Sequence, residues 1–154
     1  MSPAQKRAEP SFSTPWFVAA LVMVAIIWGH SLVPGTGSSA ESGIVLSLLK
    51  GVLTALGLPA GWLTEFMVRK SAHFLSNAIL GFLFIQAFDP GRTLHKTNAA
   101  LALAACLLTA SIDETIQLSV PGRTGRAADA LLDVCGACAA VVIRTIALRA
   151  RARD

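Results

Sequence analysis

Charged residues are scarce in this chain of 154 residues. They make up 14% of the sequence, whereas apolar residues make up 54% and the mean hydropathy is +0.62. Soluble domains usually carry about 25% charged residues. A water-soluble fold of this size could not cover its surface with so few charges, so much of its apolar surface must face lipid. The composition therefore excludes an ordinary soluble domain and predicts a membrane protein.

The sequence also lacks the cysteine pattern of a disulfide-bonded protein and the continuous basic surface of a nucleic-acid-binding protein. Its three cysteines, Cys106, Cys135 and Cys138, lie within apolar stretches, so we expect neither a disulfide framework nor an exposed redox thiolate. The net charge is +4, but the lysines and arginines lie between apolar stretches and form no single basic face. This distribution argues against nucleic-acid binding and is typical of charges that flank membrane spans.

Four apolar stretches are long enough for transmembrane helices, which need about 20 residues each. The predicted fold is an all-α polytopic membrane helix bundle with spans at residues 15–33, 69–88, 97–120 and 127–148. Residues 15–33 also resemble a signal peptide, but the apolar run is long for that role and no soluble domain follows it. We therefore expect a retained first helix.

The segment between the first two spans is ambiguous. Residues 34–43 are rich in Gly and Ser, which predicts a loop. Residues 44–66 are interrupted by Lys50 and Pro59, and the piece 44–56 is too short to cross a bilayer. We expect an interfacial or re-entrant segment at about 44–66, and a fifth span is the alternative.

The distribution of lysine and arginine predicts the orientation in the membrane. Four spans place both termini on one side, and that side carries the larger number of basic residues, which favours cytoplasmic termini in the plasma membrane. We expect a disordered cytoplasmic tail at residues 1–14, a transmembrane domain at 15–149 and a basic cytoplasmic tail at 150–154. Arg144 lies about one turn from the inner end and is expected to extend to the surface.

The predicted topology brings most ionisable groups at membrane depth to the extracytoplasmic end of the bundle. Lys70, His73 and Asn77 share one helical face of the second span. The candidate residues are Lys70, His73, Asn77, Asp113, Glu114, Gln117, Arg123, Arg126, Asp129 and Asp133. A charge at the centre of a spanning helix costs roughly 2.5–3.5 kcal/mol on insertion scales, so such groups usually face the bundle interior and find partners. A structural ion-pair network would explain one such pair, but a set this varied favours a polar functional site.

These residues lie in motifs that resemble the VanZ-like family. The motifs are RKSAHF at 69–74, DETIQ at 113–117 and PGRTGRAAD at 121–129, and the segment SLVPG at 31–35 is similar to the family's sequence after its first helix. The resemblance covers about residues 16–140. The family's namesake is linked to low-level resistance to the glycopeptide teicoplanin, so the resemblance implies a cell-envelope role without implying drug resistance here.

The resemblance also implies which positions are the family's signature. These are Lys70, His73, Asp113, Glu114, Gln117, Arg123 and Asp129. Two positions depart from the family pattern, since Asn77 stands where an aromatic residue is frequent and Asp133 where Asn is frequent. Asp133 adds a carboxylate to the site.

The first functional hypothesis is an enzyme or binding protein that acts on an anionic lipid-linked or cell-wall group at the outer leaflet. Arginine binds phosphate and carboxylate through two parallel hydrogen bonds, and histidine titrates near neutral pH. The candidate catalytic residues are His73, Asp113, Glu114 and Asp129. The candidate ligand-binding residues are Lys70, Asn77, Gln117, Arg123 and Arg126.

Two alternatives remain open from the residues alone. His73, Asp113, Glu114 and Asp129 offer ligand types that suit a divalent metal ion, although no HExxH motif supports one. The protein could also be a non-catalytic accessory or partner-binding protein or a small transporter subunit, but no inverted repeat is visible. The sequence carries no signal for the oligomeric state or the substrate.

Overall fold

The structure, a computed structural model, describes residues 12–91 and 94–151, which form five α-helices and no strand. The helices are α1 (Thr14–Ser31), α2 (Gly35–Ala55), α3 (Glu65–Phe88), α4 (Lys96–Leu118) and α5 (Ala127–Arg151). Helices α1, α3, α4 and α5 are long and apolar enough to cross a membrane, which confirms the predicted bundle. Most of the two predicted tails, residues 1–11 and 152–154, lies outside the described residues.

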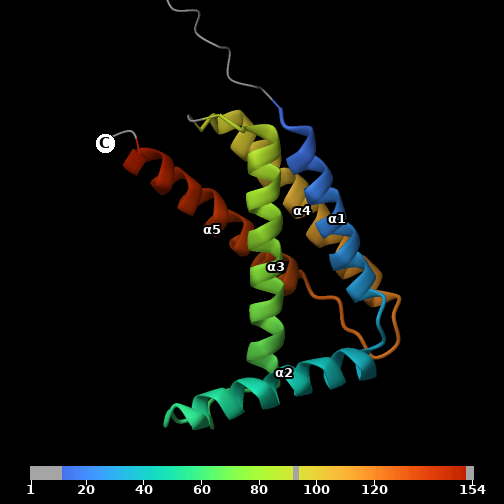
Figure 1. The fold of residues 1–154 in the computed structure, drawn as a ribbon. Helices are drawn as coiled ribbons and strands as arrows, with labels where there is room; N and C mark the ends of the chain where they lie inside the picture. The colour runs from blue at the N-terminus through green and yellow to red at the C-terminus, as the bar shows by residue number, and fades with distance from the viewer. Residues whose placement is uncertain (1–11, 92–93, 152–154) are drawn as a thin grey trace, which may run out of the picture.

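The prediction of a loop at residues 34–43 was wrong, because helix α2 begins at Gly35 and runs through this segment. Long-range packing overrides the low helix propensity of Gly and Ser. The backbone N–H of Gly35 donates to the carbonyl of Pro121 (3.0 Å), and Gly35 packs directly against Gly122. Helix α2 lies across the lower end of α3, transverse to the other helices (Figure 1), the orientation expected of an interfacial segment.

Helix α3 begins at Glu65, four residues before the predicted span at 69–88. The Thr64 side chain caps it by accepting a hydrogen bond from the backbone N–H of Met67 (3.3 Å). Arg69 then forms an ion pair with Glu65 one turn earlier (2.9 Å). The basic residues that appeared to open the span are therefore already inside the helix.

Helices α3 and α5 approach each other closely at two glycines. A Cβ atom at Gly81 would lie 2.7 Å from the Cα of Ala137, and one at Gly136 would collide with the backbone carbonyl of Phe74. Small residues let helix backbones come together in this way in membranes. The apolar core extends from this crossing toward α1 and α4: Ala20, Val24, Ile27, Leu80, Phe84, Ile85, Ala102, Cys106 and Ala137.

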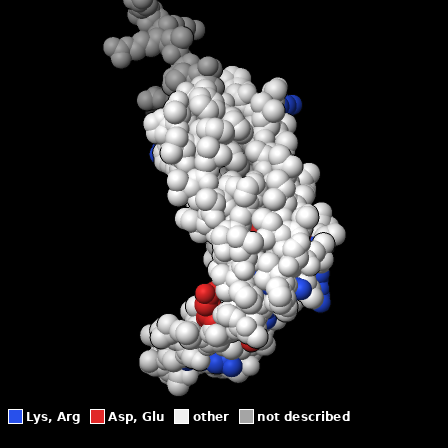
Figure 2. Space-filling view, turned by 90° about the vertical axis from the view of Figure 1, so that its right-hand side faces the viewer, with Lys and Arg blue, Asp and Glu red and all other residues white. Residues whose placement is uncertain are grey.

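Large apolar side chains are exposed along the outside of the helices. Val22 on α1, Leu108 on α4 and Ile143 on α5 are each more than half exposed. In the space-filling view, the middle of the visible face carries almost no charge, and most of the visible charged atoms lie toward the end where α2 lies (Figure 2). This arrangement fits a bundle whose sides face lipid.

The opposite end of the bundle is joined by polar contacts of its own. The backbone N–H of Ser13 donates to the carbonyl of Ala87 (2.8 Å), which holds the start of α1 beside the end of α3. The prediction that Arg144 extends to the surface was wrong. Arg144 is buried, and its guanidinium donates to Gln86 Oε1 (2.6 Å) and to the carbonyl of Asp89. The guanidinium is held inside the bundle because these acceptors lie where α3 ends, although its buried Nη1 has no hydrogen-bond partner among the described residues.

Candidate functional site

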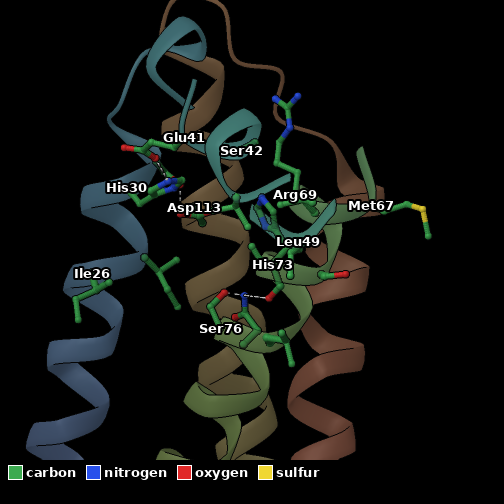
Figure 3. Close-up of a pocket in the computed structure, with 18 of the residues that line it drawn as sticks. Ile26, His30, Glu41, Ser42, Leu49, Met67, Arg69, His73, Ser76 and Asp113 are labelled. Carbon is green, nitrogen blue, oxygen red and sulfur yellow. Dashed lines mark hydrogen bonds and ion pairs between the residues drawn. The ribbon is translucent and has the colours of Figure 1, made fainter. Parts of the chain in front are cut away.

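A cleft of about 620 Å³ opens at the α2 end of the bundle. Its walls come mainly from α1, α2 and α3 and are largely apolar, including Met23, Val45, Leu49, Trp62 and Leu75. Its polar lining includes Ser31, Arg69, His73, Asn77, Asp113 and Arg123. In the close-up view, His30 and Glu41 lie on one side of the cleft and Arg69 on the other, with Asp113 between them (Figure 3).

Asp113 is fully buried on α4 and both of its oxygens are hydrogen-bonded. Oδ1 accepts from the Ser31 hydroxyl (2.6 Å) and Oδ2 from the Gln117 side-chain amide (2.9 Å). The spacing of Asp113 and Gln117 by four residues produces this pair, as the shared helical face predicts. Sequence reasoning did not select Ser31 as a site residue, although it begins the SLVPG segment.

Two polar pairs join α3 to α5 on successive turns. Lys70 forms an ion pair with Asp129, and His73 Nδ1 lies 3.2 Å from Asp133 Oδ1. Asp133 is fully buried, whereas Asp129 is only partly buried. The close approach at Gly81 sets this register, so the carboxylate beside His73 is Asp133 and not Asp129.

Glu114 meets the backbone of the loop that follows α4. Its Oε2 accepts a hydrogen bond from the backbone N–H of Arg126 (2.6 Å). The Arg126 side chain is exposed and forms no hydrogen bond or ion pair within the described part of the chain. The structure therefore brings Arg126 to the site through its main chain, whereas the sequence analysis predicted a role for its charge.

Arg123, from the same loop, extends into the cleft. Its Nη1 donates to Ser38 Oγ (2.5 Å) and its Nη2 to the carbonyl of His30 (3.3 Å). Its buried Nε has no hydrogen-bond partner among residues 12–91 and 94–151, and its guanidinium forms no ion pair with any of them. Burial lowers the pKa of Arg123 below its ordinary value, against the opposing effect of Asp113.

Asn77 and His30 complete the polar lining of the cleft. Asn77 is fully buried, and its Nδ2 donates to the carbonyl of His73 (3.2 Å) while its Oδ1 has no partner among the described residues. His30 Nε2 lies 2.9 Å from Glu41 Oε2, and both side chains are about half exposed. Sequence reasoning missed Glu41 because it placed residues 34–43 in a loop.

The VanZ/LLP1 family model matches residues 16–148, nearly the whole chain. The chain belongs to the VanZ/LLP1 family. No curated protein and no solved structure gave a significant match.

In this VanZ/LLP1 protein, the positions singled out from the sequence come together at the α2 end, but in two groups. His73, Asp113 and Glu114 lie together with Asp133. Lys70 and Asp129 form a separate pair nearer the start of α5. The four residues of the metal-ion alternative therefore do not all lie together, because Asp129 pairs with Lys70 while Asp133 lies beside His73, Asp113 and Glu114.

Proposed function

We propose that this VanZ/LLP1 membrane protein binds the anionic head group of a cell-envelope lipid at the extracytoplasmic end of the bundle. Arg123 carries the proposal. Its guanidinium is partly removed from water, lines the cleft and has no carboxylate partner among the described residues. A phosphate or carboxylate at this place would supply the missing counter-charge and accept from the unpartnered Nε.

The shape of the cleft supports a lipid-linked ligand over a free anion. Its lining combines a few polar groups with apolar side chains that are themselves exposed, including Ile26, Val45 and Trp62. An acyl or polyprenyl chain could lie along these side chains while its head group lies at Arg123. Ligand sites commonly combine apolar walls with a small number of placed polar groups in this way.

The cleft also presents groups suited to proton transfer. His73 lines the cleft and is hydrogen-bonded to the buried Asp133. A head group held by Arg123 would lie in the same cleft as an imidazole held in place by a carboxylate, which is an arrangement that general acid–base chemistry uses. Binding is the core of the proposal, and acid–base catalysis by His73 is its extension.

One observation favours this function over a closed structural ion-pair network. Arg123, Asp113 and Glu114 lie at one end of the bundle, yet none of them forms an ion pair within the described part of the chain. In the sequence, lysine and arginine are more numerous in the segments expected on the side of the termini, which supports an extracytoplasmic position for the cleft.

The test is lipid binding by the full-length chain in detergent. The probes are short-chain phosphatidic acid and, for comparison, short-chain phosphatidylcholine. Arg123→Gln should weaken phosphatidic acid binding at least about tenfold, since hydrogen bonds to charged groups contribute about 1.5–3 kcal/mol. Arg126→Gln is the matched control, because it removes the same charge from an exposed side chain three residues away. Equal losses in the two variants would indicate nonspecific attraction and contradict the proposal.

A further inference from the structure

Four ligand-type side chains meet inside the bundle beside the cleft. His73 from α3, Asp113 and Glu114 from α4 and Asp133 from α5 each offer one nitrogen or oxygen atom, and these four atoms all lie within 4.8 Å of one another. The three carboxylates are buried and His73 is mostly buried. Three different helices therefore deliver their polar groups to one small volume.

No lysine or arginine forms an ion pair with any of the four groups within the described residues. The one ion pair that the set forms within the described part of the chain joins His73 to Asp133. With all three carboxylates ionised, the set would carry a net negative charge even if His73 were protonated. Burying unpaired charge costs several kcal/mol per ion, so a cation bound here would stabilise the ionised carboxylates.

Two oxygens of the set have no hydrogen-bond partner among residues 12–91 and 94–151. They are Oε1 of Glu114 and Oδ2 of Asp133, and both side chains are more than nine-tenths buried. The other oxygen of Glu114 is held by the Arg126 N–H, and that of Asp133 by His73. Each carboxylate is thus oriented through one oxygen while the other stays free, as happens in metal sites whose ligands are fixed by neighbouring hydrogen bonds.

We propose that His73, Asp113, Glu114 and Asp133 form a binding site for one divalent transition-metal ion. One imidazole nitrogen with carboxylate oxygens suits Mn²⁺ or Zn²⁺, whereas Mg²⁺ and Ca²⁺ favour oxygen ligands alone. The proposal stands on these four groups and does not require lipid binding at Arg123. Because His73 and Asp113 also line the cleft, the ion would lie beside any ligand bound there. With one nitrogen of His73 bonded to Asp133 and the other on the ion, metal binding would exclude acid–base catalysis by His73.

The experiment measures Mn²⁺ binding to the full-length chain in detergent, with any purification tag removed and bound metal first stripped by a chelator. The loss of the free Mn²⁺ electron paramagnetic resonance signal gives the stoichiometry and affinity. We expect one ion per chain. Asp133→Asn and Glu114→Gln should each weaken binding at least about tenfold, and Glu65→Gln, which removes a carboxylate paired with Arg69 outside the set, should change it less than about twofold.

A wild-type chain that shows no saturable Mn²⁺ binding would overturn the proposal, and so would Asp133→Asn binding as tightly as the wild type. If the ligand variants fail to fold, pulsed resonance on a chain with His30→Gln and His95→Gln replaces them. His73 is then the only histidine left in the sequence. Coupling of the bound Mn²⁺ to an imidazole nitrogen would support the site, and its absence would contradict it.

Discussion

Replacing Gly81 with alanine is expected to force helices α3 and α5 apart. The new Cβ would lie 2.7 Å from the Cα of Ala137 and 3.0 Å from its carbonyl oxygen, whereas ordinary contacts begin at about 3.4 Å. These neighbours are backbone atoms, so no side-chain rotation can relieve the overlap. Inserting a methyl group into a packed interior costs about 1–3 kcal/mol. We expect the unfolding free energy to fall by about that amount.

The same displacement should reach the polar site, because Ala137 lies one turn from Asp133 on α5. The contact between His73 Nδ1 and Asp133 Oδ1 is already 3.2 Å, so a shift of a few tenths of an ångström would weaken it. Gly81→Ala should therefore reduce Mn²⁺ affinity as well as stability, although residue 81 contacts no ligand group.

Thermal unfolding in detergent, followed by tryptophan fluorescence, measures the stability loss. Gly51→Ala on α2 is the matched control, because nothing lies within 4 Å of a Cβ built there and alanine favours helix by about 1 kcal/mol over glycine. Gly51→Ala should be neutral or stabilising. If Gly81→Ala unfolded at the same temperature as Gly51→Ala, the close crossing of α3 and α5 would be refuted.

Two further substitutions test the buried hydrogen bonds at the two ends of the bundle. Ser31→Ala removes the hydroxyl that donates to Asp113 and should cost about 1–3 kcal/mol in thermal unfolding, whereas Ser111→Ala on the exposed face of α4 should cost little. Equal effects would contradict the assigned contact. Arg144→Met should destabilise by a similar amount or more because it leaves buried carbonyls without a donor, while Arg149→Met at an exposed position serves as its control. An Arg144 variant as stable as its control would show that the residue reaches water instead.

The spanning helices could be predicted from the sequence because their signal is local. A run of about 20 apolar residues needs no knowledge of its neighbours. The start of α2 could not be predicted from the sequence. The Gly- and Ser-rich segment becomes helical where Gly35 packs against Gly122, almost ninety residues later in the chain. That contact depends on the loop after α4, which has no regular pattern to predict it.

The sequence predicted most residues of the candidate site but not which of their side chains contact each other. Helical spacing places Asp129 and Asp133 on one face of α5, and either could have met His73. The choice depends on how far α5 slides along α3, which Gly81 and Gly136 fix through contacts between the two helices. Similarly, the sequence shows the charge of Arg126 but not that its backbone N–H, rather than its side chain, reaches Glu114.

Labelling from outside the cell tests most directly whether α2, the start of α3 and the loop after α4 share one outward-facing end. Single cysteines replace Gly61 before α3, Thr124 in the loop before α5 and Thr97 at the start of α4, in a chain whose native cysteines are alanine; all three positions are exposed. With a membrane-impermeant maleimide, positions 61 and 124 should react in intact cells and position 97 only after permeabilisation. Labelling of 61 and 124 from opposite sides would contradict a shared site, and labelling of both from the cytoplasm would contradict its outward position.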